Sequence, residues 1–425
     1  MTTKPARRRV GGAIAATSCI VGLIAAPAIA LAEPIPSPTP SSVHHDQQRP
    51  PDRRGTIISS TKVRDLDAAQ LRTTLRESGY PTDEVRYGAT GYRVSYRTVD
   101  YHGRATTASG LVSFPNNRHD RLQPVLFAHG TSTSKPEAPS TGGGDYHQAG
   151  ALSFAGAGFA SIAPDYLGLG TGPGRPPYLD TRTEVSASTD LLRAARTLAD
   201  RHHRGLRSTV HVTGFSQGAH AALTTAHALQ RGTAGTGFRL GATAPISGAY
   251  SLRDHQLPAM INGDVDPKLA TLYTGYLFTS WNALRGIYDD SEEIFRPPYA
   301  SIVDDLYDGT HSGQEVFEGM PDTPAQLLND RGMSLLADPS GPFADAVDEY
   351  DAACRGWRPS GPIRLYYATG DAEAVNGNTE QCVADFARRG VSVPTVDLGE
   401  LDHVGSGAVG VVDAAGWFRS LDRRN

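Results

Sequence analysis

A strand-like run that ends in a serine between two glycines is the feature that most restricts what this chain can fold into. Residues 208–215, STVHVTGF, have the alternation of a strand, and the alanine-rich residues 217–231 favour a helix. Between them stands GFSQG, residues 214–218, which matches the pattern of a nucleophile elbow. The elbow strains the backbone of its serine, and the glycines remove side chains that would collide as strand and helix meet. The pattern predicts Ser216 as a reactive nucleophile.

The segments around the elbow alternate between short apolar runs and helix-like stretches. We expect strands at residues 92–99, 106–114, 124–130, 158–165, 208–215, 241–250, 363–370 and 391–399, with helices at 146–156, 183–200, 217–231 and 408–421. The first two strands form an antiparallel pair around the turn at residues 101–103. Buried strands that alternate with helices pair in parallel and need cover on both faces. The sequence therefore predicts an α/β fold built on a mostly parallel sheet with helices on both faces.

One long interval breaks this rhythm. Between residues 250 and 362 the sequence has helix-like patterns but no clear strand, and a structureless loop of that length is improbable. We interpret residues 253–360 as a helical cap inserted into the α/β core, whose two parts are residues 61–252 and 361–425. The alternative is a second independent domain.

The N-terminus has the pattern of an export signal. Basic residues at positions 4 and 7–9 precede an uncharged run, residues 10–32, that ends in Ala-Leu-Ala. This arrangement predicts a cleavable secretory signal peptide at residues 1–32 and a secreted, extracellular protein. The alternative is an uncleaved membrane anchor, because the run is long enough to span a bilayer. Residues 33 to about 54 are rich in proline, serine and charge, which predicts a disordered linker that we place at residues 33–60.

Cysteine usage and charge agree with this interpretation. Cys19 leaves with the signal peptide, and a remaining pair in an exported protein, Cys354 and Cys382, favours a disulfide. No Cys/His cluster has the spacing of metal ligands, so we expect no metal. The formal net charge is −5, without the concentrated basic face that nucleic-acid binding requires.

A serine hydroxyl needs a general base that is oriented by an acid. In a fold with a nucleophile elbow, the acid follows the serine in the chain and the histidine comes last. His403 stands between the last predicted strand and the last predicted helix, which is the position expected of the base. The other downstream histidines are on the helix after the serine or in the cap: His220, His227, His255 and His311.

The acid should follow the strand at residues 363–370. Asp371 and Glu373 both qualify by position. We favour Asp371 because it lies four residues after Tyr367, and we keep Glu373 as the alternative. Asp402 is a weaker third candidate, because it adjoins His403 in the chain.

The negative oxygen of a tetrahedral intermediate needs two hydrogen-bond donors. One is the backbone N–H of Gln217, the residue after the nucleophile. The second should come from the loop after the strand PVLFA, where we favour Thr131 over Gly130. His129, in the same loop, is expected to shape it rather than to take part in chemistry.

Five motifs together resemble the secretory lipase family, which comprises fungal secreted lipases and bacterial relatives. They are FAHGT at 127–131, APDYLGLG at 163–170, GFSQG at 214–218, LYYATGD at 365–371 and DH at 402–403. The resemblance covers roughly residues 85–420. It implies the α/β-hydrolase fold with a helical cap, hydrolysis of carboxylic esters without a cofactor, the triad Ser216, Asp371 and His403, and the oxyanion donors Thr131 and Gln217. The chain departs from the family after Asp371, where it lacks the usual D-x-x-V-P.

The residues and the resemblance lead to one main hypothesis, a secreted lipase or esterase that works through an acyl-enzyme on Ser216. Its partners would be small-molecule esters or lipids, with transient contact to a lipid interface and no stable protein partner. Rival hypotheses are an aminopeptidase or amidase, an acyltransferase, and a non-catalytic binding protein. Apolar residues of the cap would line the acyl pocket or form the cap's own core: Leu272, Tyr273, Tyr276, Leu277, Phe278 and Trp281.

Overall fold

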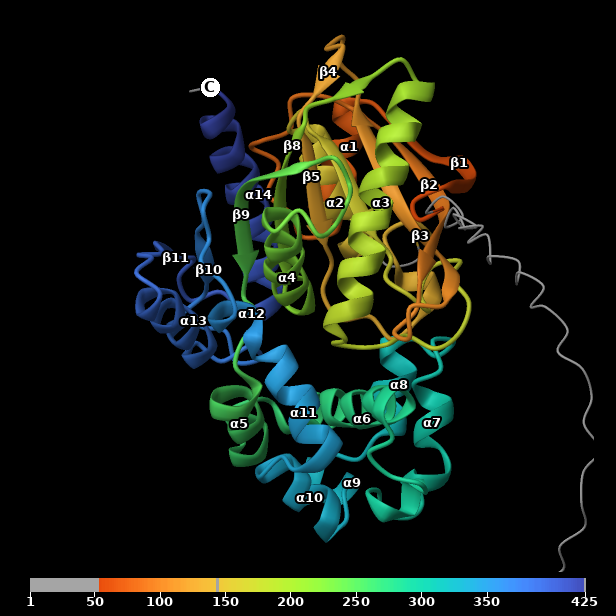
Figure 1. Ribbon diagram of the computed structural model, residues 1–425, viewed down its shortest axis with the longest axis vertical. Helices are drawn as coiled ribbons and strands as arrows, with labels where there is room; N and C mark the ends of the chain where they lie inside the picture. Colours follow the sequence, from red (N-terminus) through yellow and green to blue (C-terminus); the bar gives the residue numbers. More distant parts are fainter. Residues whose placement is uncertain (1–52, 143–144, 424–425) are drawn as a thin grey trace, which may run out of the picture. The chain divides into compact units, whose positions relative to one another are not determined.

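A nine-stranded sheet organises the part of the chain that the computed structural model describes, residues 53–142 and 145–423 (Figure 1). The strand order is β1-β2-β3-β6-β5-β8-β9-β10-β11. The strands are β1 Ile57–Leu66, β2 Ala89–Val99, β3 Ala105–Pro115, β5 Pro124–Ala128, β6 Ala160–Pro164, β8 Thr209–Phe215, β9 Arg239–Ile246, β10 Leu365–Tyr367 and β11 Thr395–Asp397. The short strands β4 (Arg121–Leu122) and β7 (Gly205–Leu206) pair separately. The predicted signal peptide and most of the predicted linker lie outside the described residues.

The strand directions bring distant parts of the chain to one edge. β1, β2, β3 and β6 are antiparallel neighbours, whereas every pairing from β6 to β11 is parallel. The loops that follow β5, β8, β10 and β11 therefore leave the sheet at the same edge. The prediction of a mostly parallel sheet is confirmed.

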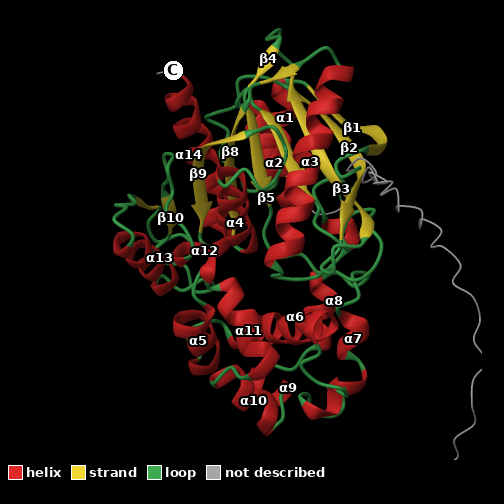
Figure 2. Ribbon diagram, in the orientation of Figure 1, coloured by secondary structure: helices red, strands yellow, loops and turns green. Residues whose placement is uncertain are grey.

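Helices cover both faces of this sheet (Figure 2). Helices α1 (Ala68–Glu77), α2 (Asp145–Gly156) and α14 (His403–Asp422) share one apolar core, while α3 (Thr181–Arg201), α4 (Gln217–Gln230) and α13 (Gly377–Arg388) share the other. Strand β8 supplies side chains to both, because Val212 lies in the second core while His211 stacks on Phe418 of α14. Burial on both faces explains why the parallel strands are so apolar.

The interval between β9 and β10 is helical. Its helices are α5 Leu257–Asn262, α6 Pro267–Arg285, α7 Val303–Leu306, α8 Gly313–Gly319, α9 Pro324–Leu327, α10 Asp330–Ala337, α11 Gly341–Tyr350 and α12 Ala352–Arg355. They surround an apolar core of their own that includes Phe278, Trp281 and Phe343. We refer to residues 252–355 as the cap. Within the described chain, no helix is both long and apolar enough to cross a membrane.

The linker predicted to end at residue 60 is too long. Ile57 already begins β1, which pairs with β2 in an antiparallel ladder that aligns Ile57 with Tyr96 and Ser60 with Val94. Most side chains of this edge strand remain exposed. Main-chain hydrogen bonds to β2 hold the strand, and they need no pattern of buried side chains in the sequence.

The predicted disulfide is present and joins Cys354 of α12 to Cys382 of α13. The two cysteines are 28 residues apart. We expect the double variant Cys354→Ala/Cys382→Ala to lose about 3.5 kcal/mol of unfolding free energy, because the unfolded chain regains the freedom of that loop. Urea unfolding followed by circular dichroism measures the loss. Either single alanine variant should lose about as much, and a loss below about 1 kcal/mol would contradict this expectation.

Candidate active site

Ser216 occupies a sharp turn between β8 and α4. Its backbone angles are φ 57° and ψ −121°, a conformation that L-residues rarely adopt and that costs about 1–3 kcal/mol. A β-carbon on Gly214 would overlap the carbonyl of Gly218, and one on Gly218 would overlap the carbonyl of Ala128. Only glycine fits at either position. The serine is thereby held at the edge of the sheet where the parallel strands end.

Three side chains from different elements meet at this edge. The Oγ of Ser216 lies 2.8 Å from Nε2 of His403, and Nδ1 of His403 lies 2.8 Å from Oδ2 of Asp371. Because a carboxylate only accepts hydrogen bonds, Nδ1 carries the proton and Nε2 accepts from the serine hydroxyl. His403 and Asp371 are 5% and 7% exposed, so this chain of hydrogen bonds is largely shielded from water.

His403 is the first residue of α14, whereas the sequence predicted that this helix begins near residue 408. Asp402 caps the helix by accepting from the backbone N–H of Gly405 at 2.7 Å. Several glycines in the first turns lower the helix propensity and hid the start of the helix. At one of them, Gly407, a β-carbon would overlap the hydroxyl of Tyr146. Close packing against neighbouring side chains, not propensity, decides this end of the helix.

The three carboxylates considered for the acid have different positions. Asp371 contacts the imidazole, and its Oδ1 accepts from the backbone N–H groups of Glu373 at 2.9 Å and Ala374 at 3.0 Å. The side chain of Glu373 instead accepts from the hydroxyl of Tyr273 at 2.6 Å. Asp402 is occupied as a helix cap. Only Asp371 is placed to orient His403.

The environment of His403 raises the pKa of its imidazole. Burial by itself lowers this pKa, but the hydrogen bond and charge of Asp371, with the charges of Glu373 and Asp402, outweigh it. The net pKa lies above the 6.5 of an unperturbed imidazole. A raised pKa makes the ring a stronger base toward the serine hydroxyl.

For the ester hydrolysis that the sequence predicts, we expect kcat/KM to fall on the acid side with a midpoint above about pH 6.5, the pKa of ordinary histidine. Only the neutral imidazole can accept the serine proton, so activity falls as the pH drops through the raised pKa. A profile of kcat/KM for p-nitrophenyl butyrate between about pH 5 and pH 9 tests this expectation. A midpoint well below that of free histidine would contradict it.

The residues proposed as oxyanion donors lie beside the serine. Thr131 and Gln217 both line the same cavity as Ser216 and His403. Gln217 is the first residue of α4, where backbone N–H groups have no acceptor within their own helix. The side chain of Gln217 is held in place, because its Nε2 donates to the buried carboxylate of Glu184 at 2.8 Å. The hydroxyl of Thr131 lies 3.2 Å from that of Tyr178.

His129 shapes the loop that carries Thr131. It is fully buried, its Nδ1 lies 2.7 Å from the carbonyl of Gly130, and its own carbonyl accepts from the hydroxyl of Tyr166 at 3.0 Å. Burial lowers the pKa of His129 to about 3, and the nearby His147 adds to the effect. The ring therefore stays neutral and holds the loop.

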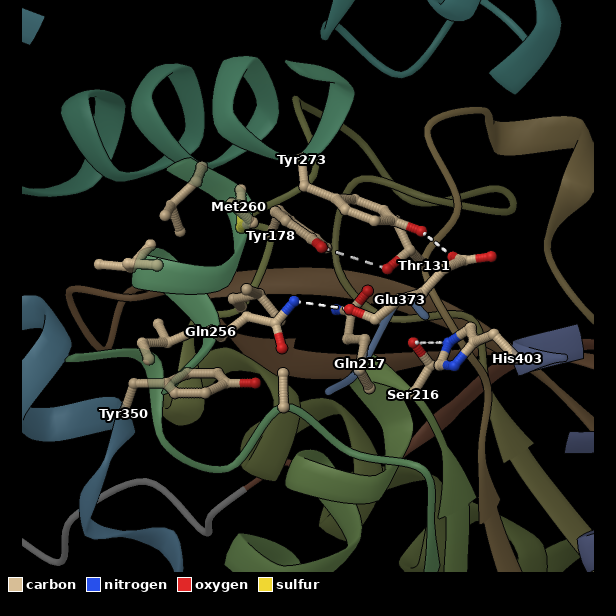
Figure 3. Close-up of a pocket in the computed structure, with 16 residues that line it drawn as sticks. Thr131, Tyr178, Ser216, Gln217, Gln256, Met260, Tyr273, Tyr350, Glu373 and His403 are labelled. Atoms are coloured by element: carbon tan, nitrogen blue, oxygen red, sulfur yellow. Dashed lines mark hydrogen bonds between the residues drawn. The ribbon is translucent and has the colours of Figure 1, made fainter. Parts of the chain in front are cut away.

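A cavity of about 520 Å³, its open mouth included, lies between the serine and the cap (Figure 3). Apolar and aromatic side chains make up most of its lining. The lining residues are Thr131, Tyr178, Leu179, Ser216, Gln217, Ala249, Leu252, Gln256, Leu257, Met260, Tyr273, Leu277, Tyr350, Glu373, Ala374 and His403.

Of the six cap residues considered for the acyl pocket, Tyr273 and Leu277 line the cavity. The others, Leu272, Tyr276, Phe278 and Trp281, are buried in the cap's apolar core. This segment of the cap therefore contributes both to the cavity lining and to the cap's own core. Among residues 53–142 and 145–423, no cluster of three or more His, Cys, Asp or Glu side chains could hold a metal ion.

The strand order and the elbow after β8 define the α/β-hydrolase fold. Solved structures share it. A presumed hydrolase from Legionella pneumophila matches with a TM-score of 0.79 at 23% identity, covering 87% of this chain and 99% of its own. The rice cell wall degrading esterase LipA from Xanthomonas oryzae matches with a TM-score of 0.75 at 23% identity, covering 88% and 100%.

Candida antarctica lipase A is more distant, with a TM-score of 0.59 and 15% identity over 82% of this chain and 78% of its own. No protein-family model and no curated protein matches the sequence. The resemblance to secreted lipases inferred from the motifs therefore holds at the level of the fold.

Proposed function

We propose that this protein is a secreted serine hydrolase that cleaves carboxylic esters of the lipase or esterase type. The observation that carries the proposal is the continuous chain of hydrogen bonds from Ser216 through His403 to Asp371 beside a mainly apolar cavity. Secretion is supported by the N-terminal sequence pattern and by the Cys354–Cys382 disulfide.

In the proposed acylation step, Nε2 of His403 takes the proton of the Ser216 hydroxyl as its oxygen attacks the ester carbonyl. Asp371 holds the ring in the required tautomer and stabilises the imidazolium that forms. His403 then passes the proton to the departing alcohol as the C–O bond breaks. Water then attacks the acyl carbon while His403 accepts its proton, and His403 returns that proton to Oγ of Ser216 as the acyl–oxygen bond breaks, which releases the carboxylic acid.

The negative charge of the tetrahedral intermediate would be stabilised by the backbone N–H of Gln217 and by the loop at Thr131. The hydrogen bond from Gln217 to Glu184 supports this role, because it fixes the residue that carries the N–H. Preorganised donors of this kind typically contribute about 10²–10³ in kcat each.

The acyl group would lie against the apolar part of the cavity, which includes Leu252, Leu257, Met260 and Leu277. Water excluded from these surfaces on binding favours acyl chains over small polar groups. Lipid substrates would reach the site by transient contact with a lipid interface.

A series of p-nitrophenyl esters of increasing chain length tests the proposal, with an aminoacyl naphthylamide of matched size as the amide control. We expect ester hydrolysis that improves from acetate to medium chains and exceeds amide cleavage. Faster cleavage of the amide would favour an aminopeptidase instead. No turnover of any ester or amide would favour a binding protein or an enzyme that transfers acyl groups to another acceptor.

A further inference from the structure

Glu373 faces the cavity although it takes no part in the contact between Asp371 and His403. It lines the same space as Ser216 and His403, and one of its carboxylate oxygens accepts from Tyr273 of α6 at 2.6 Å. Figure 3 shows the two side chains meeting above the serine. A carboxylate can accept several hydrogen bonds, so Tyr273 does not exhaust its capacity.

The backbone of Glu373 is fixed on both sides. Its N–H donates to Oδ1 of Asp371 at 2.9 Å, and its carbonyl accepts from Nε2 of Gln256 at 2.6 Å. Gln256 is in turn held by Asn378, whose Nδ2 donates to Oε1 of Gln256 at 2.7 Å. The carboxylate is therefore positioned before any substrate arrives, which reduces the entropy lost on binding.

No lysine or arginine in the cavity wall pairs with Glu373, and the one titratable base there is His403, which must be neutral to accept the serine proton. Of the sixteen lining residues, Glu373 is the one carboxylate, and none is lysine or arginine. Burial and the charge of Glu373 raise the pKa of Tyr273, so its hydroxyl stays protonated and continues to donate. The cavity thus presents a fixed negative charge in surroundings that are mainly apolar, where such a charge acts strongly.

The position of Glu373 indicates which part of an ester it would meet. In Figure 3 its carboxylate lies at the His403 end of the cavity, whereas Met260 and Tyr350 lie at the opposite, apolar end. In the proposed mechanism the acyl chain occupies the apolar end. The departing alcohol receives its proton from His403 and so lies at the end where Glu373 is found.

We propose that Glu373 selects esters whose alcohol portion carries an ammonium group. An N⁺–H donor at this position would form a charge-assisted hydrogen bond with the carboxylate, and an anionic alcohol would be repelled. The proposal rests on the ester hydrolysis proposed above and specifies the substrate class of the same site. It gives the two neighbouring carboxylates separate tasks, since Asp371 orients the base and Glu373 recognises the substrate.

The test compares kcat/KM for two esters of butyric acid with similar shape, the dimethylaminoethyl ester, protonated at neutral pH, and its uncharged analogue, the isopentyl ester. We expect wild type to prefer the charged ester, and Glu373→Gln to lower the charged-to-neutral ratio by about tenfold or more, as loss of a charge-assisted hydrogen bond implies. The glutamine keeps the size of the side chain and an acceptor for Tyr273. Using a ratio cancels general losses of activity or folding.

Two further variants separate charge recognition from structure. Tyr273→Phe removes the hydrogen bond to the cap but keeps the carboxylate, so the ratio should stay close to that of wild type. Glu400→Gln removes the same charge from an exposed residue outside the cavity lining and should also keep the ratio. An equal fall of the ratio in Tyr273→Phe would assign the effect to the bridge between cap and loop and overturn the proposal.

Hydrolysis of the isopentyl ester distinguishes the two proposals. If wild type hydrolyses it but shows no preference for the charged ester, or if Glu373→Gln keeps the ratio, the assignment of Glu373 is wrong while ester hydrolysis stands. If neither ester is hydrolysed, the proposed function and the substrate class fail together.

Discussion

Replacing Ser216 by alanine is expected to lower kcat/KM for p-nitrophenyl butyrate by at least about 10⁴-fold, because the hydroxyl that forms the proposed acyl-enzyme is lost. The change keeps the β-carbon, and so the strained backbone and its packing remain as they are. The free energy of unfolding should change little. Initial rates, corrected for spontaneous hydrolysis, measure the effect.

Ser60→Ala is the matched control for this variant. Ser60 is an exposed serine of β1, at the edge of the sheet far from the elbow in the strand order. Its removal should leave kcat/KM unchanged. Turnover by Ser216→Ala within about tenfold of wild type would show that another residue attacks the ester.

The second large loss of activity is expected when Asp371, the proposed acid of the triad, is replaced. Asp371→Asn should reduce kcat by about 10³–10⁴-fold, because an amide at this position favours the wrong tautomer of His403 and cannot stabilise the imidazolium. The side chain keeps its size and can still accept from the backbone N–H groups of Glu373 and Ala374. The fold should therefore be retained, which a thermal unfolding curve checks.

Glu373→Gln is the paired variant, because it changes a neighbouring carboxylate in the same way. On the neutral isopentyl ester its kcat should fall by no more than about tenfold, since its side chain contacts Tyr273 and not His403. A fall of about 10³-fold in Glu373→Gln together with a small effect in Asp371→Asn would reverse the assignment of the acid.

The sequence predicted the parts of the site that depend on local chemistry. Ser216 was predicted because its turn needs glycine on both sides, which leaves a pattern within five residues. His403 was predicted from its place after the last strand of a parallel sheet. Residues that directly follow parallel strands meet at the same edge of the sheet, whatever sequence lies between those strands.

Other features depend on partners that are distant in the sequence. The sequence left Asp371 and Glu373 as alternatives, because the choice depends on which of them reaches the imidazole. The hydrogen bonds of Glu373 to Tyr273 and of Gln217 to Glu184 join residues 100 and 33 positions apart. Such contacts leave no local pattern in one sequence.

Among the element boundaries that the sequence misplaced, those of β1 and α14 were wrong for a related reason. β1 is defined by its main-chain pairing with β2, and the start of α14 by the Asp402 cap and by tight packing at Gly407. The mostly exposed β1 has no pattern of buried side chains, and the glycines at the start of α14 favour a loop. Tertiary contacts override these local preferences.

The central claim is that Ser216 is a nucleophile activated by His403, and covalent labelling tests it most directly. A fluorophosphonate probe should label wild type at one site, which peptide mass spectrometry should locate at Ser216, and should label His403→Ala far more slowly. Absence of a label on Ser216 in the folded protein, or a rate unaffected by loss of the imidazole, would contradict the claim.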